Sequence, residues 1–247
     1  MNQKLTQGEY DALFADRQLK AARNHNDLFS KVVDKEFLNF YEKVKSNTML
    51  SIESLYDFYL SMRYINAAEI PGSIVEVGTW KGGSLALAML SDSSKSRNYI
   101  GYDTFEGHLQ PEGDEKDVRG SNLLDRYKEI IEREGSWCKA DYDETNEFLN
   151  SLKFAEQSFT LHKGDVKKVL PSSKVDELAI LRIDCDWYAE SLISLEVLYD
   201  RIAPGGIVIL DDFGHHSGQR KAFDEFFSNR HLKWTHVNYA TISAIKP

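Results

Sequence analysis

An apolar run meets a glycine-rich turn at Ile74-Val-Glu-Val-Gly-Thr-Trp-Lys-Gly-Gly-Ser84. The apolar run is typical of a buried strand of a parallel sheet. The glycines at 78, 82 and 83 would let the backbone approach a ligand, to which the free amides of a following helix could point. The turn is neither a G-x-G-x-x-G dinucleotide fingerprint nor a phosphate-binding P-loop. It predicts a strand, a turn and a helix at a ligand site, with a purely structural turn as the alternative.

Further apolar runs follow this strand, and segments with helical spacing separate them. The expected strands are Tyr99–Tyr102, Phe159–His162, Leu178–Ile183 and Ile207–Leu210, with a closing pair at Trp234–Tyr239 and Thr241–Ile245. Pro204-Gly205-Gly206 is expected to end the helix behind the fourth strand. Alternating strands and helices predict an α/β fold with a mostly parallel, seven-stranded sheet that helices cover on both faces.

Residues 1–68 show helical spacing and are expected to form an N-terminal helical extension or lid, before a main domain at residues 69–247. Pro71-Gly72 separates the two. The polar stretch Glu106–Arg119 carries glycines and a proline, so we expect a mobile loop there, followed by a helix over Leu123–Glu134.

Composition excludes several classes of protein. The 247 residues carry a formal net charge of -9, which argues against nucleic-acid partners because those bind mainly through Lys and Arg on phosphates. No stretch approaches the roughly 20 apolar residues of a membrane span, and the N-terminus lacks the apolar core of a signal peptide. Cys138 and Cys185 match no metal spacing and no disulfide framework. We therefore expect a cytoplasmic protein with reduced thiols and no membrane partner.

Two acidic pairs come directly after successive predicted strands: Asp184 with Asp186, and Asp211 with Asp212. Two unit charges about 4 Å apart repel by roughly 4 kcal/mol at an effective dielectric constant of about 20. Such a cluster needs a cation, shared protons or wide spacing, and a divalent metal is the simplest of these. Oxygen ligands suit Mg²⁺, Mn²⁺ or Ca²⁺. The alternative is that the aspartates are ordinary polar residues at strand ends.

Asp103 lies about 25 residues beyond the glycine turn, where an acidic side chain can accept both hydroxyls of a ribose. Taken alone it could equally be a turn cap. Together with the glycine turn it indicates a nucleoside-bearing ligand, and Gly164-Asp165 after the third strand could add contacts to an adenine.

From Asn47 to the end, the chain resembles the macrocin O-methyltransferase (TylF) family of metal-dependent sugar O-methyltransferases, which have the Rossmann-like class I methyltransferase fold. The resemblance rests on five segments in the family's order and spacing. They are Thr48-Met49, Ile70–Ser84, Tyr102-Asp-Thr-Phe-Glu-Gly107, Leu178-Ala-Ile-Leu-Arg-Ile-Asp-Cys-Asp-Trp-Tyr188 and Pro204-Gly-Gly-Ile-Val-Ile-Leu-Asp-Asp-Phe-Gly214. Cys185 stands where the family commonly has glycine, Phe213 replaces a frequent tyrosine, and Gly135–Asn150 and the first 45 or so residues match nothing.

The resemblance implies S-adenosylmethionine as the methyl donor. Glu76, Gly78 and the following turn would hold its methionine portion, Asp103 its ribose, and Asp165 would lie beside its adenine. The cofactor-binding residues expected on this basis are Thr48, Met49, Glu76, Gly78, Thr79, Trp80, Gly83, Ser84, Asp103, Thr104, Phe105, Gly164, Asp165 and Asp184.

The resemblance further implies that Asp184, Asp211 and Asp212 bind Mg²⁺ (or Mn²⁺) and that Asp186 is the general base. The acceptor would be a small molecule with adjacent hydroxyls, most simply a sugar. A catechol or phenolic acceptor is one alternative, and an Asp-x-Asp nucleotide-sugar glycosyltransferase and a non-catalytic binding protein are rivals of other classes. A homodimer through the N-terminal helices is possible.

The remaining polar and aromatic residues give weaker signals. His215 and His216 are interpreted as loop residues in preference to ligands or bases, and His108 has no identifiable partner. Trp80 and Trp187 would flank the cleft, although aromatics beside strands are usually core residues.

Overall fold

The computed structural model describes residues 28–154 and 156–247. The chain divides into two compact units, Met1–Asn39 and Phe40–Pro247. Within the first unit, the described part is a turn followed by the beginning of helix α2 (Lys35–Val44). Part of the helical segment expected near the N-terminus, residues 1–27, lies outside the described residues. Everything below concerns the second unit.

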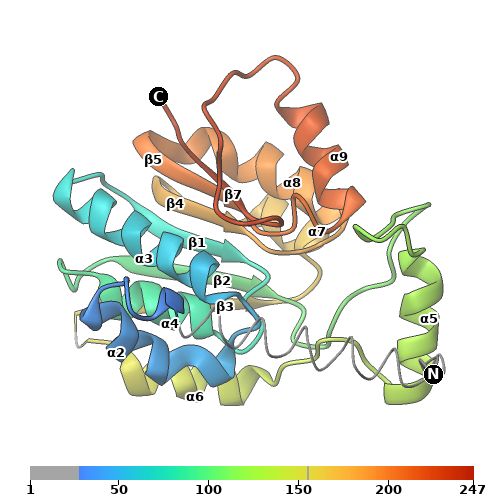
Figure 1. The fold of residues 1–247 in the computed structure, drawn as a ribbon, viewed down its shortest axis with the longest axis horizontal. Helices are drawn as coiled ribbons and strands as arrows, with labels where there is room; N and C mark the ends of the chain where they lie inside the picture. Colours follow the sequence, from blue (N-terminus) through green and yellow to red (C-terminus); the bar gives the residue numbers. More distant parts are fainter. Residues whose placement is uncertain (1–27, 155) are drawn as a thin grey trace, which may run out of the picture. The chain divides into compact units, whose positions relative to one another are not determined.

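A seven-stranded sheet forms the centre of the second unit (Figure 1). Its strands are β1 (Ser73–Val77), β2 (Asn98–Asp103), β3 (Ser158–Lys163), β4 (Leu178–Ile183), β5 (Ile202–Leu210), β6 (Thr235–His236) and β7 (Ile242–Ile245). The strand order is β3-β2-β1-β4-β5-β7-β6. The first five strands pair in parallel, and β7 runs antiparallel to both β5 and β6. The expected mostly parallel sheet is confirmed.

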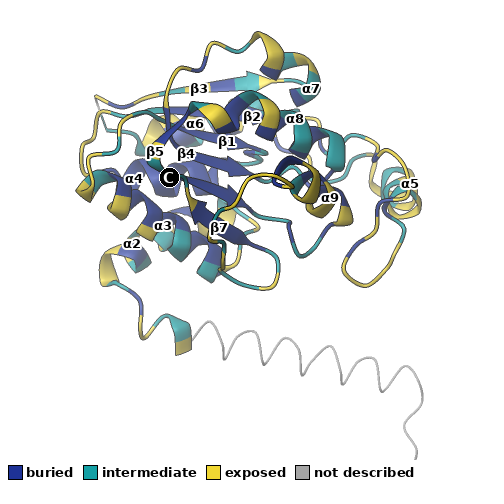
Figure 2. Ribbon diagram, turned by 90° about the horizontal axis from the view of Figure 1, so that it is seen from above, coloured by how far each residue is buried: buried dark blue, intermediate teal, exposed yellow. Residues whose placement is uncertain are grey.

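Helices lie on both faces of this sheet. They are α3 (Ile52–Ala67), α4 (Gly83–Ser91), α6 (Tyr142–Leu152), α7 (Val166–Val169), α8 (Tyr188–Leu198) and α9 (Ser217–Phe226); a further helix, α5, spans Leu123–Glu134. Helix α4 packs against α3, α6 and β2, whereas α8 packs against α7, α9 and β4. Helix α5 lies to the side of the sheet in both views and buries little besides Leu123 (Figures 1 and 2).

The core lies around the central strands. All six residues of β4 are buried, as are four of the five in β1 (Figure 2). The expected apolar runs therefore became the innermost strands, as hydrophobic burial requires. None of the described helices is long and apolar enough to cross a membrane.

One boundary prediction is wrong. Pro204-Gly205-Gly206 does not end the helix behind β4, because α8 ends at Leu198 and β5 already begins at Ile202. Leu178 pairs with Ile202 but Ile180 pairs with Ile207, so β5 carries extra residues in a bulge. Gly205, with φ +81°, donates from its amide to Lys246 O over 2.8 Å. The Pro-Gly-Gly sequence bends this strand instead of preceding it.

Candidate active site

A cavity of about 360 Å³ lies at the carboxyl ends of the parallel strands. The strand order reverses between β1 and β4, which is where open α/β sheets bind ligands. Most of the expected site residues line the cavity: Thr48, Met49, Gly78, Thr79, Trp80, Ser84, Asp103, Thr104, Gly164, Asp184, Asp186, Asp211 and Asp212. The expected residues outside the lining are Glu76, Gly83, Phe105 and Asp165.

The turn after β1 is shaped by close backbone approach. Gly78 has φ +91°, and a Cβ there would lie 1.8 Å from Asp184 O. A Cβ on Gly83 would lie 2.5 Å from Asn47 O. Glycine at both positions lets the turn pack between the end of β4 and residues 47–48. These two contacts are within the chain, and the approach of this turn to a ligand stays a prediction.

Asp103 ends β2 beside this turn. Its carboxylate accepts hydrogen bonds of 2.7 Å from the amides of Trp80 and Phe105. Both carboxylate oxygens are thereby fixed at the cavity, and each keeps a lone pair for a ligand donor. Asp165, by contrast, caps α7 by accepting from the Lys167 amide, while its neighbour Gly164 lines the cavity.

A buried guanidinium lies beneath the acidic cluster. Arg182 on β4 is 1% exposed, and its Nη1 lies 2.9 Å from both Glu76 Oε1 and Asp184 Oδ2. Its Nη2 lies 3.1 Å from Asp211 Oδ1. Glu76 is fully buried on β1. Glu76 does not line the cavity and is linked to the site through its ion pair with Arg182.

The two aspartate pairs do converge. The Asp184 amide donates to Val77 O and the Asp211 amide to Ile183 O, so each pair begins where its strand leaves the sheet. One carboxylate oxygen of each of Asp184, Asp211 and Asp212 lies within 4.8 Å of the corresponding oxygens of the other two. Burial raises the pKa of Asp184 and of Asp211 to about 7, against the opposing effect of Arg182.

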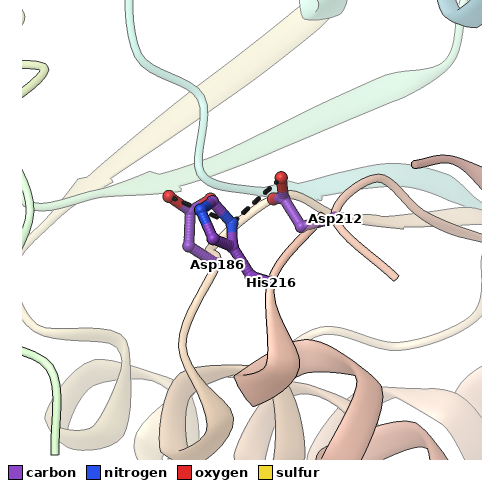
Figure 3. Close-up of side chains that lie close together, drawn as sticks. All are labelled: Asp186, Asp212 and His216. Atoms are coloured by element: carbon purple, nitrogen blue, oxygen red, sulfur yellow. Dashed lines mark ion pairs between the residues drawn. The ribbon is translucent and has the colours of Figure 1, made fainter. Parts of the chain in front are cut away.

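Asp186 points toward two histidines. Its Oδ2 lies 3.2 Å from His108 Nε2. The same oxygen lies 3.8 Å from His216 Nδ1, which in turn lies 3.3 Å from Asp212 Oδ1 (Figure 3). Burial lowers the pKa of His108 to about 4, so this ring is neutral at pH 7. Burial also opposes charge on His216, but the carboxylates of Asp212 and Asp186 outweigh it and raise its pKa to about 9.

Gln219 fastens the two aspartate-bearing turns to each other. This side chain is fully buried on α9. Its Oε1 accepts from the Asp212 amide over 2.8 Å, and its Nε2 donates to Ile183 O over 3.4 Å. Its own amide donates to Asp186 O over 3.2 Å. Gln219 therefore holds the residues after β4 and β5 in one arrangement.

Aromatic rings form one wall of the cavity, which we call the aromatic wall (Trp137, Trp187, His108). Ring centroids are 5.1 Å apart for His108 and Trp137, 5.2 Å for His108 and Trp187, and 5.8 Å for the two tryptophans. Trp187 Nε1 donates to Leu109 O, which ties the loop after β2 to the end of β4. Such faces suit the apolar side of a ring-shaped ligand.

Sequence reasoning missed several of these residues. Arg182 carried a usable signal, because a charged residue inside a fully buried strand must be paired. His216 was interpreted as a loop residue and His108 as partnerless, yet both lie beside Asp186. Their pairing, like the place of Trp137 and Gln219, depends on contacts between segments far apart in the chain.

Comparison with known protein families identifies one family that matches most of the chain. The family model described as Macrocin-O-methyltransferase (TylF) matches residues 17–241. The chain belongs to the macrocin O-methyltransferase family. The resemblance inferred from its motifs is confirmed, but its expected start at Asn47 is wrong, because the family match already begins at residue 17.

Relatives within and near the macrocin O-methyltransferase family are distant in sequence. The chain is 27% identical over 184 residues to demethyldecarbamoylnovobiocin O-methyltransferase of Streptomyces niveus, covering 73% of this chain and 68% of the relative. It is 26% identical over 171 residues to 8-demethyl-8-(2,3-dimethoxy-alpha-L-rhamnosyl)-tetracenomycin-C 4'-O-methyltransferase of Streptomyces olivaceus, covering 68% and 63%. The match thus spans a little under two thirds of the latter enzyme.

Solved structures show the same fold. The O-methyltransferase NovP superposes with a TM-score of 0.68 at 24% identity, covering 81% of this chain and 82% of NovP. The calicheamicin methyltransferase CalS11 superposes with a TM-score of 0.65 at 17% identity, covering 98% and 94%. At these identities the superpositions establish the class I methyltransferase fold of this family member and nothing finer.

Proposed function

We propose that this protein transfers a methyl group from S-adenosylmethionine to a hydroxyl of a small polyhydroxylated acceptor, with the help of a divalent metal ion. The observation that carries the proposal is the convergence of Asp103, the β1 turn and the four aspartates on one cavity. Family membership supports methyl transfer to oxygen.

The cofactor end of the cavity has the features that such a donor needs. The Asp103 carboxylate, fixed by two backbone amides, would accept the ribose hydroxyls. The turn after β1, with Thr79 and Ser84, would receive the methionine portion, while Thr48 and Met49 border the same space. Because Asn47–Leu50 line the cavity, we also propose that residues 1–68 act as an extension or lid of the main domain.

The acidic end fits a divalent cation. Five carboxylates lie there: Glu76, Asp184, Asp186, Asp211 and Asp212. The cationic groups that pair with them are the Arg182 guanidinium and the His216 imidazole, so negative charge is in excess. Asp212 Oδ2 is buried with no hydrogen-bond partner among the described residues. A buried carboxylate oxygen without a partner costs free energy of folding unless it binds an ion or a proton. Asp184, Asp211 and Asp212 would hold Mg²⁺ or Mn²⁺.

In the reaction that we propose, Asp186 is the general base. When bound, the metal would orient the acceptor and lower the pKa of one hydroxyl. Asp186 would take the proton of that hydroxyl. At the same time the hydroxyl oxygen would bond to the methyl carbon, and the bond between that carbon and the sulfur of the donor would break. His108 and His216 hold the Asp186 carboxylate between them. Asp186 is 9% exposed, which would limit the access of water to this proton transfer.

A sugar is the acceptor that we propose, on the basis of family membership and the relatives. Adjacent hydroxyls can reach the acidic end while the apolar face of the ring lies on the aromatic wall. The relative from Streptomyces olivaceus is named for a rhamnosyl-bearing tetracenomycin, which supports a sugar-bearing acceptor. A catechol or phenol would satisfy the same wall and is the second candidate. Family membership argues against the glycosyltransferase and scaffold alternatives.

Asp186→Asn tests the assignment of the base. We expect turnover to fall by at least about 10²-fold, because this is a typical effect of removing a general base. Binding of S-adenosylhomocysteine and of Mn²⁺, measured by titration calorimetry, should stay nearly unchanged. Turnover close to that of the unmodified enzyme would refute the assignment, and loss of both binding events would show a structural role instead.

A further inference from the structure

A second group of metal-ligating side chains overlaps the first but includes a nitrogen. One ligand atom from each of Asp186, Asp212 and His216 lies within 4.8 Å of the others (Figure 3). His216 Nδ1 is 3.3 Å from Asp212 Oδ1 and 3.8 Å from Asp186 Oδ2. Two atoms that each lie about 2.1 Å from a shared ion are roughly 3.0–3.4 Å apart. The group needs only a small adjustment to close around an ion.

The polar atoms of this group lack the partners that burial normally requires. His216 is 7% exposed, yet its Nδ1 makes no hydrogen bond of acceptable geometry among the described residues, and the same holds for Asp212 Oδ2. Buried polar atoms in proteins are nearly always satisfied, and exceptions often mark a missing ion or water. This ring nitrogen faces two carboxylates at 3.3 and 3.8 Å without a hydrogen bond to either, and an ion that displaces its proton would bind all three groups.

The group is also built on fixed backbone. The His216 amide donates to Asp212 O over 2.9 Å, and His216 forms an isolated β-bridge with Asp117. Gln219 binds the backbone of both Asp212 and Asp186. The three side chains therefore start from a preorganised turn, as metal ligands commonly do.

We propose that Asp186, Asp212 and His216 form a second cation site that takes a transition metal such as Co²⁺ or Zn²⁺. Imidazole nitrogen favours these ions, whereas Mg²⁺ prefers oxygen ligands throughout. Asp184, Asp211 and Asp212 supply only oxygen, so the two sites differ in selectivity although they share Asp212.

Occupation of this second site inhibits methyl transfer, a consequence that rests on the proposed function. An ion there coordinates the Asp186 carboxylate, which then cannot accept the proton of the acceptor. We expect Zn²⁺ or Co²⁺ to inhibit the Mg²⁺-supported reaction, and further Mg²⁺ to leave it unaffected over the same concentration range.

The direct test is Co²⁺ binding to the full chain, followed by calorimetry and by the visible absorption of the bound ion. Asp184→Asn removes a ligand of the all-oxygen site, and we expect this variant still to bind Co²⁺. Adding His216→Gln should weaken that binding at least tenfold. His215→Gln is the matched control, because this neighbouring imidazole bonds to Tyr239 Oη and does not belong to the group. It should leave the Co²⁺ affinity of Asp184→Asn unchanged.

Two results overturn the proposal: failure of Asp184→Asn to bind Co²⁺, or equal binding with and without His216. Circular dichroism checks that each variant folds. If His216→Gln does not fold, pulsed electron paramagnetic resonance of Cu²⁺ in the unmodified protein replaces it, and absence of imidazole nitrogen coupling contradicts the site. Binding requires neither donor nor acceptor, so absence of methyl transfer would refute the proposed function and leave this measurement intact.

Discussion

At the scale of single residues, Arg182 makes the acidic site compatible with folding. One guanidinium contacts Glu76, Asp184 and Asp211 beneath the cavity floor. Burying carboxylates without such a partner would cost several kcal/mol for each ion. The same contact leaves Asp186 and Asp212 to the histidines, so the cluster separates into a half supported by Arg182 and a half supported by His216.

Arg182→Met should therefore destabilise the protein strongly. The methionine fills similar volume, but one buried and two half-buried carboxylates lose their partner, and breaking a buried ion pair typically costs about 3–5 kcal/mol. The free energy of unfolding from urea titration at pH 7 measures the change. Arg133→Met is the control, because its ion pair with Glu134 is exposed and should contribute little to stability. Equal effects of the two substitutions would show that the buried network is unimportant for stability.

Gln219→Ala should weaken metal binding without removing a ligand. The side chain orients the turns after β4 and β5, and losing such an orienting partner typically reduces metal affinity about 10–100-fold. Mn²⁺ titration by calorimetry measures the affinity, with the exposed Gln110→Ala as the control. Unchanged Mn²⁺ affinity in Gln219→Ala would mean that the backbone alone fixes these turns.

At the scale of elements, the sequence identified those whose pattern is local. Leu178–Ile183 and Leu123–Glu134 were predicted with the bounds that the structure shows, because burial on both faces and helical spacing are each visible in one segment. The start of β5 was not predictable in this way. Its bulge at Pro204-Gly205-Gly206 depends on pairing with β4 and on Lys246 near the C-terminus.

The candidate site shows the same limit. The aspartates could be placed together because parallel strands bring their carboxyl ends to one edge. The two histidines beside them could not be predicted in this way, because His108 lies in the loop after β2 and His216 in the turn before α9. No spacing in the sequence relates these two segments.

Helix α3 meets strand β7 through a carboxyl group that burial disfavours as an anion. Burial raises the pKa of Asp57 to about 6, although a hydrogen bond with Ser243 on β7 opposes the shift. A raised folded-state pKa contributes stability that is present below the unfolded value of about 4 and is lost as pH rises through 6. The ionised Asp57 at pH 7.5 is thus a local weakness of the contact between α3 and β7.

Asp57→Asn should consequently stabilise the protein at neutral pH. Relative to the unmodified protein we expect little difference at pH 4 and a gain of about 1–3 kcal/mol at pH 7.5, from a shift of about two units at 1.36 kcal/mol each. Urea unfolding at both pH values measures this. The exposed Asp114→Asn controls for the change in net charge. A gain that does not grow with pH would contradict the burial of this carboxylate.

At the scale of the whole molecule, the sheet order brings segments from most of the chain to one cavity. Residues 47–50, the turns after β1, β2, β4 and β5, and Trp137 all border it. A ligand that fills this cavity therefore contacts parts of the chain that are far apart in sequence. Its binding energy is added to the stability of the folded state, because the unfolded chain has no such site.

S-adenosylhomocysteine should raise the melting temperature of the full chain. At about 100 times its dissociation constant a ligand stabilises the folded state by about 2.7 kcal/mol, and a chain of this size gains about 2–4 °C per kcal/mol, so we expect roughly 5–10 °C. Asp103→Asn should reduce the shift, because its side chain offers the ribose one acceptor oxygen and no charge. The shift should persist in the presence of a chelator, since Asp103 and the β1 turn do not belong to the group of carboxylates proposed to hold the metal. Differential scanning calorimetry measures all three conditions, and an unchanged melting temperature with the ligand would place the cofactor outside this cavity.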